Sequence, residues 1–525
     1  MRLATILTLL LLAGCRTGAP ASSNDPLASE PYRVGFTSRW LIDPTRTYDT
    51  ALPDGRRYAN AFPGGRAPRP ILVNTWYPAD TGGTPMRHGD YLEVSAPDPR
   101  LTAFHEAIAD YERRVICEQL VGAPPDELDP AGRAALEAHL ATPILAARDA
   151  PAAPGRFPVV IYHAGAGSSY EDNARLCEYL AAHGYVVIGS TFLAADGASF
   201  NVDARDASAE DVAFLLAHAR TLPFADATRA AMIGHSAGAH ATLWTATGPD
   251  IGLDALICLD TTQDYYSPAN PLWRPMVERT LARSDRITAP LLMAAEPHAI
   301  FDLADRLESA PRTYLTVPFV DHDSFISQGV ARARHERDAE AEAIAAAYTG
   351  LCRYVLCFLD AHVKQDAAAL AELRERHVGA QPGRALRAEH VAPGGVAIEP
   401  FIDDGSSLPA PRQVRPFLAN HGVEATAALL ERVAERDPDS PLFHPIFGMS
   451  LFLDLHAAGS TEEMERLWPA YRNGRPELVD SYVSMARLLF QIGEGHADRT
   501  AYARTCLEIA AVLDPAHVEA NELRR

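Results

Sequence analysis

Short apolar runs alternate with helix-forming stretches from Ile71 to about His362, and this alternation constrains the fold more than any other feature of the chain. Strands that alternate with helices build a mostly parallel sheet that is covered by helices on both faces. We therefore expect an α/β fold here. The expected strands are Ile71–Tyr77, Val159–Tyr162, Val186–Ile188, Met232–Ile233, Ala255–Leu259, Leu291–Met293 and Tyr314–Val317.

One of these strands leads directly into the pentapeptide Gly234-His235-Ser236-Ala237-Gly238, and a helix-forming stretch follows it. This is the G-x-S-x-G pattern, which places a serine on a sharp turn between a strand and a helix. Glycine is required two residues before and after the serine because a side chain there would crowd the turn. Ser236 is therefore the candidate nucleophile, and an inert turn serine is the alternative.

A serine hydroxyl needs an imidazole to take its proton and a carboxylate to orient that imidazole. When the serine lies on such a turn, the acid and then the histidine follow it along the chain. Asp260 ends the strand Ala255–Leu259, and His322 follows the last expected strand. These two are the candidate acid and base. Glu296 and Asp302, which follow the next strand, remain alternatives for the acid.

A loop of small residues follows the strand Val159–Tyr162 and precedes a helix; it reads His163-Ala164-Gly165-Ala166-Gly167-Ser168. Such a loop lets backbone N–H groups approach a developing oxyanion closely. The expected donors are the amide of Ala237 and the amide of Gly165 or Ala166. A phosphate-binding loop is the rival interpretation, but the Lys and Ser/Thr that should follow are missing. We expect His163, His235 and His240 to have packing roles.

The first 15 residues resemble a bacterial lipoprotein signal peptide. They carry one basic residue, a short apolar stretch and the sequence Leu12-Ala13-Gly14-Cys15. The resemblance implies removal of residues 1–14 and lipidation of Cys15. Residues 15–31 would then be a flexible tether. An ordinary secretory signal or a short membrane anchor is the alternative.

No other stretch approaches the length and apolarity of a spanning helix in the sequence. Arg16 follows the cysteine, which in lipoproteins favours the outer membrane. We therefore expect an exported protein that is anchored by its lipid, at the periplasmic face of the outer membrane or at the cell surface.

Composition excludes some classes of function. The formal net charge of −21 argues against nucleic acid, which demands a basic surface. Six cysteines remain after Cys15, without the spacing of a disulfide scaffold or a zinc site. We expect buried thiols, no metal and no cofactor.

The sequence divides into regions beyond the tether. We expect an α/β domain over residues 32–370, with a helical insertion at about 101–147 that could cap a site. A Pro- and Gly-rich linker follows at 371–412, and a helical region at 413–525.

The helical region resembles tetratricopeptide repeats. The matching residues are Phe447, Gly448, Leu451, Gly459, Leu467, Ala470, Pro476, Tyr482, Met485, Ala486, Leu489, Gly493, Ala503, Leu507, Ala510 and Pro515. Two repeats are fewer than the three that usually stand alone, so this region should pack on the α/β domain. A plain helical extension is the alternative. A protein partner is possible for these helices.

Residues of about 70 to 365 resemble α/β hydrolases of the platelet-activating-factor acetylhydrolase and dienelactone-hydrolase-like group. The resemblance is carried by Val73–Ala79, Pro158–His163, Gly234–Gly238, Leu259-Asp260 and His322–Phe325. It implies the α/β-hydrolase fold and supports Asp260 as the acid. The chain departs from the group's usual His-Gly-x-Gly loop and has Ala239-His240 where a second glycine is usual.

Together these features predict a serine carboxylic ester hydrolase that works through an acyl-enzyme on a small or lipid-like ester. Acyl transfer or peptide cleavage by the same three residues is one alternative. A surface-anchored interaction protein with a vestigial hydrolase domain is another.

Overall fold

The computed structural model describes residues 31–80, 82–94, 98–193, 205–261, 265, 269–271, 274–336, 339–374, 377–378, 386–395, 400–492 and 497–524. The expected signal peptide, Cys15 and all but the last residue of the expected tether lie outside the described residues. The lipid anchor therefore stays a prediction.

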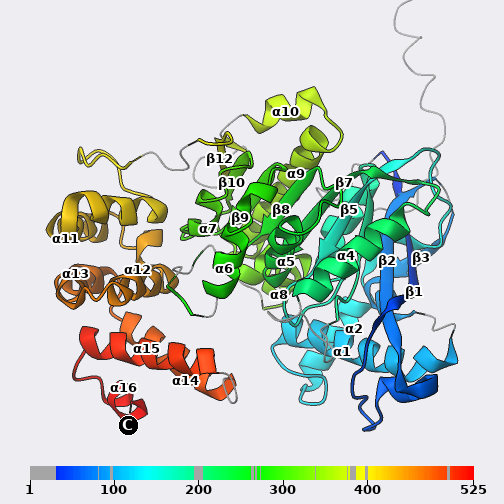
Figure 1. The fold of residues 1–525 in the computed structure, drawn as a ribbon, viewed down its shortest axis with the longest axis horizontal. Coiled ribbons are helices and arrows are strands. Elements are labelled where there is room, and N and C mark those ends of the chain that lie inside the picture. Colours follow the sequence, from blue (N-terminus) through cyan, green and yellow to red (C-terminus); the bar gives the residue numbers. More distant parts are fainter. Residues whose placement is uncertain are drawn as a thin grey trace, which may run out of the picture.

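Twelve strands form one sheet in the described part of the chain (Figure 1), in the order β11-β12-β10-β9-β8-β7-β5-β6-β2-β1-β4-β3. Their bounds are β1 Arg33–Thr47, β2 Pro68–Ala79, β3 Thr84–Arg87, β4 Pro143–Arg148, β5 Phe157–His163, β6 Val186–Gly189, β7 Ala225–His235, β8 Ala255–Leu259, β9 Leu291–Ala295, β10 Arg312–Thr316, β11 His377–Val378 and β12 Leu386–Val391. All seven strands expected from the sequence are present, and β1, β3, β4, β11 and β12 are additional.

The centre of the sheet, from β6 to β10, is parallel. β2 is antiparallel to both β1 and β6. The chain runs from β5 to β6 on one side and then returns to β7 on the other side of β5. Ligands bind outside the carboxyl ends of strands where the strand order reverses in this way. The chain has the α/β-hydrolase fold, and the turn after β7 carries Ser236.

Helices cover both faces of the sheet (Figure 1), as the alternation of strands and helices predicts. One face packs against α1 (Thr102–Val121), α3 (Ala174–Ala182), α8 (Ser327–Glu336) and α9 (Ala341–His362). The other face packs against α4 (Arg205–Ala219), α5 (Ala237–Ala246), α6 (Arg274–Leu281) and α7 (Asp302–Asp305). Successive residues of β5 point to opposite faces: Val160 joins the first core, whereas Val159 and Ile161 join the second.

The helix α9 corrects one expectation from the sequence. Among the described residues it alone is long and apolar enough to cross a membrane. Leu351, Val355, Phe358 and Leu359 on this helix are nevertheless fully buried in the core of the α/β domain. Its apolar composition therefore reflects packing against the sheet.

The expected insertion at 101–147 contains α1 and α2 (Pro130–Leu140) and ends in β4, which pairs with β1 in the sheet. Gln119 of α1 donates a hydrogen bond from Nε2 to Ser168 Oγ at 3.0 Å. The insertion therefore lies against the loop that follows β5.

The helical region comprises α11 (Pro411–Arg436), α12 (Pro445–Ala457), α13 (Thr461–Gly474), α14 (Leu478–Ile492), α15 (Ala497–Leu513) and α16 (Val518–Leu523). α12 packs on α13 and α14 on α15, and the second pair stacks on the first. This is the stacking of helical hairpins, while common repeat ancestry stays a prediction. Figure 1 shows these helices to one side of the sheet, beyond α6 and α7.

The segment expected to be a linker, 371–412, contributes strands to the sheet. β12 pairs antiparallel with β10, and β11 pairs with β12. Leu386 of β12 is 3% exposed, and it fills the space beside Gly350 of α9, where a Cβ would lie 2.6 Å from its Cδ1. The α/β domain therefore extends beyond its expected end at residue 370.

Replacement of Leu386 by alanine tests this extension. The change removes buried apolar volume, so it should lower the free energy of unfolding by about 2–5 kcal/mol. The neighbouring Arg387 is exposed, and Arg387→Ala should change it by less than about 0.5 kcal/mol. Urea unfolding of both variants is the measurement. Equally small effects would mean that this segment is a linker after all.

Candidate active site

Ser236 stands on a strained turn between β7 and α5, with a φ of 53° and a ψ of −116°. A Cβ on Gly234 would lie 2.0 Å from the carbonyl oxygen of Gly238, and a Cβ on Gly238 would lie 2.1 Å from that of His163. Both positions therefore need glycine, for the steric reason that the sequence motif predicts. The Ser236 N–H donates to the Leu259 carbonyl at 2.9 Å, which ties the turn to β8.

Ser236, His322 and Asp260 form a chain of hydrogen bonds. His322 Nε2 lies 2.9 Å from Ser236 Oγ, and His322 Nδ1 lies 2.5 Å from Asp260 Oδ2. Asp260 follows β8 directly, and His322 opens a short 3-10 turn, His322–Phe325, after β10. The carboxyl ends of parallel strands share one edge of a sheet, so residues far apart in the sequence meet there.

His322 and its partner Asp260 differ in their exposure. The Asp260 side chain is fully buried, whereas 38% of the His322 side chain is exposed. Burial by itself would lower the pKa of His322, but the hydrogen bond and the negative charge of Asp260 outweigh it and raise the pKa. Ser236 is also partly exposed, so a solute can reach both the hydroxyl and the imidazole.

The two alternative acids lie elsewhere. Glu296 follows β9 and approaches His298, with 3.5 Å between its Oε2 and His298 Nδ1. Burial, with the nearby Asp260 charge, raises the pKa of Glu296 to about 9, so this carboxyl is neutral at pH 7. Asp302 opens α7 and pairs with Arg306 at 2.5 Å. His322 therefore meets Asp260 and neither of the alternatives.

The loop after β5 lies against the turn that carries Ser236. A Cβ on Gly165 would lie 3.2 Å from Ser236 Cβ, so this glycine permits the close approach. The buried carboxyl of Asp172 holds the loop by accepting hydrogen bonds from Ser168 Oγ and Tyr162 Oη, both at 2.5 Å. The backbone of Gly165 also hydrogen-bonds to this carboxyl. Ala166 is exposed at the mouth of the loop.

Two of the histidines around the site have structural contacts. His163 is buried and stacks on Phe192, with 3.8 Å between ring centroids, and its Nδ1 lies 2.8 Å from the Ala164 carbonyl. His235 Nε2 donates to the His322 carbonyl at 3.0 Å. Burial lowers the pKa of His163 to about 4 and that of His235 to about 3, so both are neutral. His240 is buried in α5.

The acidic residues on either side of His322 fix its turn. Asp321 Oδ1 accepts from the Ser324 N–H at 2.9 Å and from Ser324 Oγ at 2.5 Å. Arg332 of α8 pairs with Asp321 at 2.9 Å and with Asp323 at 2.5 Å. The turn that carries His322 is therefore held by contacts within Asp321–Ser324 and by Arg332 of α8.

Tyr265, which is 3% exposed, is a further residue at the site that the sequence does not predict. Its hydroxyl donates a hydrogen bond to Asp260 Oδ1, the carboxylate oxygen that His322 leaves unused. The same hydroxyl accepts the N–H of Glu296 at 2.8 Å. A tyrosine five residues after the acid has no motif around it, so only the fold reveals this contact.

Glu296, His298 and His444 form a group with ligand atoms within 4.8 Å of one another, close enough to suggest a metal ion. The His298 and His444 rings, however, stack with centroids 3.5 Å apart and planes 18° apart. A metal must lie near the plane of each imidazole, at about 2.0–2.1 Å from its nitrogen. Two parallel rings do not meet this requirement at one point, so the group does not fit a metal.

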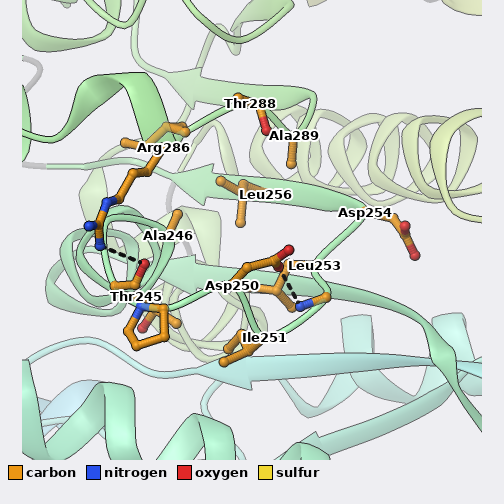
Figure 2. Close-up of a pocket in the computed structure, with 14 residues that line it drawn as sticks. Thr245, Ala246, Asp250, Ile251, Leu253, Asp254, Leu256, Arg286, Thr288 and Ala289 are labelled. Carbon is orange, nitrogen blue, oxygen red and sulfur yellow. Dashed lines mark hydrogen bonds between the residues drawn. The ribbon is translucent and has the colours of Figure 1, made fainter.

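A pocket of about 750 Å³ has no catalytic candidate among its lining residues. Figure 2 shows this pocket. It is lined by Thr245, Ala246, Gly248–Asp254, Leu256 and Arg286–Ala289. These residues lie at the end of α5 and the amino ends of β8 and β9, at the sheet edge opposite the serine. Arg286 donates to the carbonyls of Thr247 and Gly248, and Asp250 accepts the Gly252 N–H. The charged side chains of Arg286 and Asp250 in this pocket therefore bond to nearby backbone groups.

Residues 133–267 match the sequence model of the chlorophyllase family, a region that contains Ser236 and Asp260 and ends before His322. The solved structure of a ferulic acid esterase from Streptomyces cinnamoneus is similar at 17% identity and a TM-score of 0.42, over 64% of this chain and 92% of that one. A search of curated proteins found no match.

The strand order and the strand–turn–helix around Ser236 establish the α/β-hydrolase fold, and the family match agrees with it. The same match supports an esterase or a related hydrolase.

Proposed function

We propose that this protein is a serine carboxylic ester hydrolase that works through an acyl-enzyme. The observation that carries the proposal is the hydrogen-bond chain from Ser236 through His322 to Asp260. Such a chain turns a weakly nucleophilic hydroxyl into one that loses its proton as it attacks.

The roles follow from the geometry. Ser236 Oγ attacks the ester carbonyl carbon while His322 Nε2 takes its proton. Asp260 stabilises the imidazolium through Nδ1. The imidazolium then gives the proton to the departing alcohol oxygen, which leaves Ser236 acylated. Water then attacks the acyl carbon while His322 takes its proton. The imidazolium returns this proton to Ser236 Oγ as the bond between that oxygen and the acyl carbon breaks, which releases the carboxylic acid and restores the serine.

The developing oxyanion needs backbone N–H donors near Ser236. Ala237 follows the serine at the start of α5, and its amide is one proposed donor. Of the two candidates in the loop after β5, Gly165 already hydrogen-bonds to Asp172 through its backbone. We assign the second donor to Ala166, the next residue of the loop, which is exposed.

Ser236→Ala tests the nucleophile. The variant should lose labelling by a fluorophosphonate probe and should lose at least about 10³-fold in kcat, because no acyl-enzyme can form. p-Nitrophenyl esters of increasing acyl length provide the assay and also measure pocket depth. Ser284→Ala, at a serine remote from the site, is the matched control and should keep full activity.

The same experiment separates the alternatives. A wild-type protein that neither labels nor cleaves any ester would rule out the proposal and favour a vestigial hydrolase domain. Labelling without ester cleavage would favour acyl transfer or peptide cleavage by the same three residues.

The pH dependence of turnover tests the acid. Only neutral His322 can accept the serine proton, so activity is present above its pKa and lost as the pH falls through it. Since Asp260 raises this pKa, the acid limb should lie above the ordinary histidine value of about 6.5. Asp260→Asn should lower kcat by about 10⁴-fold and move the limb to lower pH.

Asp302→Asn is the control for this measurement, because Asp302 pairs with Arg306 rather than with His322. Its pH profile of kcat/KM should match the wild type. An active Asp260→Asn enzyme would assign the acid role elsewhere.

Specificity and location rest on the sequence alone. We propose a small or lipid-like ester as substrate, by resemblance to the platelet-activating-factor acetylhydrolase-like esterases. We also propose export and anchoring through a lipid on Cys15, at the periplasmic face of the outer membrane or at the cell surface.

Cys15→Ser tests the anchor. In producing bacteria fed an alkyne fatty acid, the wild type should be labelled and found with membranes, whereas this variant should be neither. Cys357→Ser, a change at another cysteine, should be labelled like the wild type. Label on Cys15→Ser would contradict a lipid at this position.

A further inference from the structure

Both oxygens of the Asp260 carboxylate are used. Oδ2 binds His322 Nδ1 at 2.5 Å, and Oδ1 accepts the hydroxyl of Tyr265. A carboxylate held at one oxygen can still turn about its Cβ–Cγ bond, whereas one held at both has a single orientation toward the imidazole. Burial beside Asp260 raises the pKa of Tyr265 well above its usual range, so the hydroxyl keeps its proton and remains a donor.

Tyr265 is itself held by the helical region. Ser450 of α12 is 1% exposed and donates from Oγ to the Tyr265 carbonyl at 2.6 Å. The Tyr265 ring lies 4.5 Å from the ring of His298, which stacks on His444 just before α12. The helical region therefore holds the backbone of Tyr265 directly, through Ser450, and its ring indirectly, through His298 and His444.

α12 is well placed to do this because its neighbours fix it in turn. Tyr482 of α14 donates to the Met449 carbonyl at 2.7 Å, and Arg475 donates to the Phe443 carbonyl at 2.6 Å. A Cβ on Gly448 would lie 2.4 Å from the hydroxyl of Tyr471 on α13, so these helices are in close contact.

The helical region also docks firmly on the α/β domain around this point. Arg412 of α11 is 8% exposed and pairs with Asp305 of α7 at 2.8 Å and with Glu389 of β12 at 3.2 Å. Its guanidinium lies 4.3 Å from the ring centroid of Tyr314. Ile300, just after β9, belongs to the core of the helical region. The two parts are therefore joined by buried polar and apolar contacts.

We propose that Tyr265 is a positioning residue for Asp260, and that α12 holds Tyr265 in place through Ser450. The helical region would then help to orient the side chains of the hydrolytic site, in addition to any role in binding a partner. The expected effect of Tyr265 on turnover rests on the proposed ester hydrolysis. The contact between Tyr265 and Asp260 stands independently of it.

Tyr265→Phe isolates the hydroxyl, because phenylalanine keeps the ring beside His298. If the hydroxyl positions Asp260, the variant should lose about 10- to 100-fold in kcat on p-nitrophenyl acetate with KM little changed. Asp260 would then hold His322 less well, so the acid limb of the pH profile should move to lower pH. The downfield proton resonance of His322 Nδ1–H should weaken or shift.

Several results would overturn this role. One is a Tyr265→Phe variant with unchanged kcat and an unchanged His322 Nδ1–H resonance. Another is an acid limb that moves to higher pH, which would mean that the Tyr265 hydroxyl weakens the charge of Asp260 instead of orienting its carboxylate. The resonance needs no turnover. A wild type that shows it but cleaves no ester would therefore contradict the proposed function while the Tyr265 contact is still tested.

Ser450→Ala tests the link to the helical region. It leaves the buried Tyr265 carbonyl without this donor, and kcat should fall about 3- to 10-fold with the same direction of pH shift. Ser481→Ala is the matched control, since Ser481 Oγ donates to the carbonyl of Glu477, four residues earlier in the same part of the chain, at 3.3 Å. Unfolding midpoints of all variants should stay within a few degrees. If Ser450→Ala and Ser481→Ala both keep full kcat, the helical region does not position the acid.

Discussion

The close approach of the Gly238 backbone to the carbonyl of His163 is the constraint on which the site depends. It brings the turn after β7 against the loop after β5, with space for no side chain at Gly238. Because β5 and β7 are neighbours in the sheet, their carboxyl ends meet where the strand order reverses. The serine and the small-residue loop are therefore adjacent by topology, and the glycines only allow them to come close enough.

This arrangement stores backbone strain, which the core around it must offset. Ser236 and Asp260 both have positive φ, 53° and 49°, although neither is glycine. Such conformations cost of the order of 1–3 kcal/mol each and persist only where the surroundings impose them. Here β8 is buried throughout, and so is Ala230–His235, the end of β7 that leads into Ser236. The strain at the candidate site is thus supported by buried strands at the centre of the sheet.

The sequence predicts the centre of this sheet well because those strands are continuous apolar runs. β8 was expected at Ala255–Leu259 and has these bounds. β1 was missed because its sequence mixes Arg39, Asp43 and Pro44 with apolar residues, and its stability comes from pairing with β2. β12 was missed because it lies among Pro- and Gly-rich segments. Ser236, Asp260 and His322 could be named from motif and chain order, whereas Tyr265 depends on contacts that no local pattern encodes.

Asp260 is linked through Tyr265 to the helical region, so its position depends on how that region docks on the α/β domain. Buried ion pairs such as Arg412 with Asp305 add little net stability, because desolvation of the charges offsets their attraction. Such ion pairs nevertheless make any docking that leaves one of the charges buried and unpaired unfavourable. An interface of this kind therefore selects one orientation of the helices over many. The hydrogen bonds from Ser450 to Tyr265 and from Tyr265 to Asp260 form only when the helices dock in one orientation.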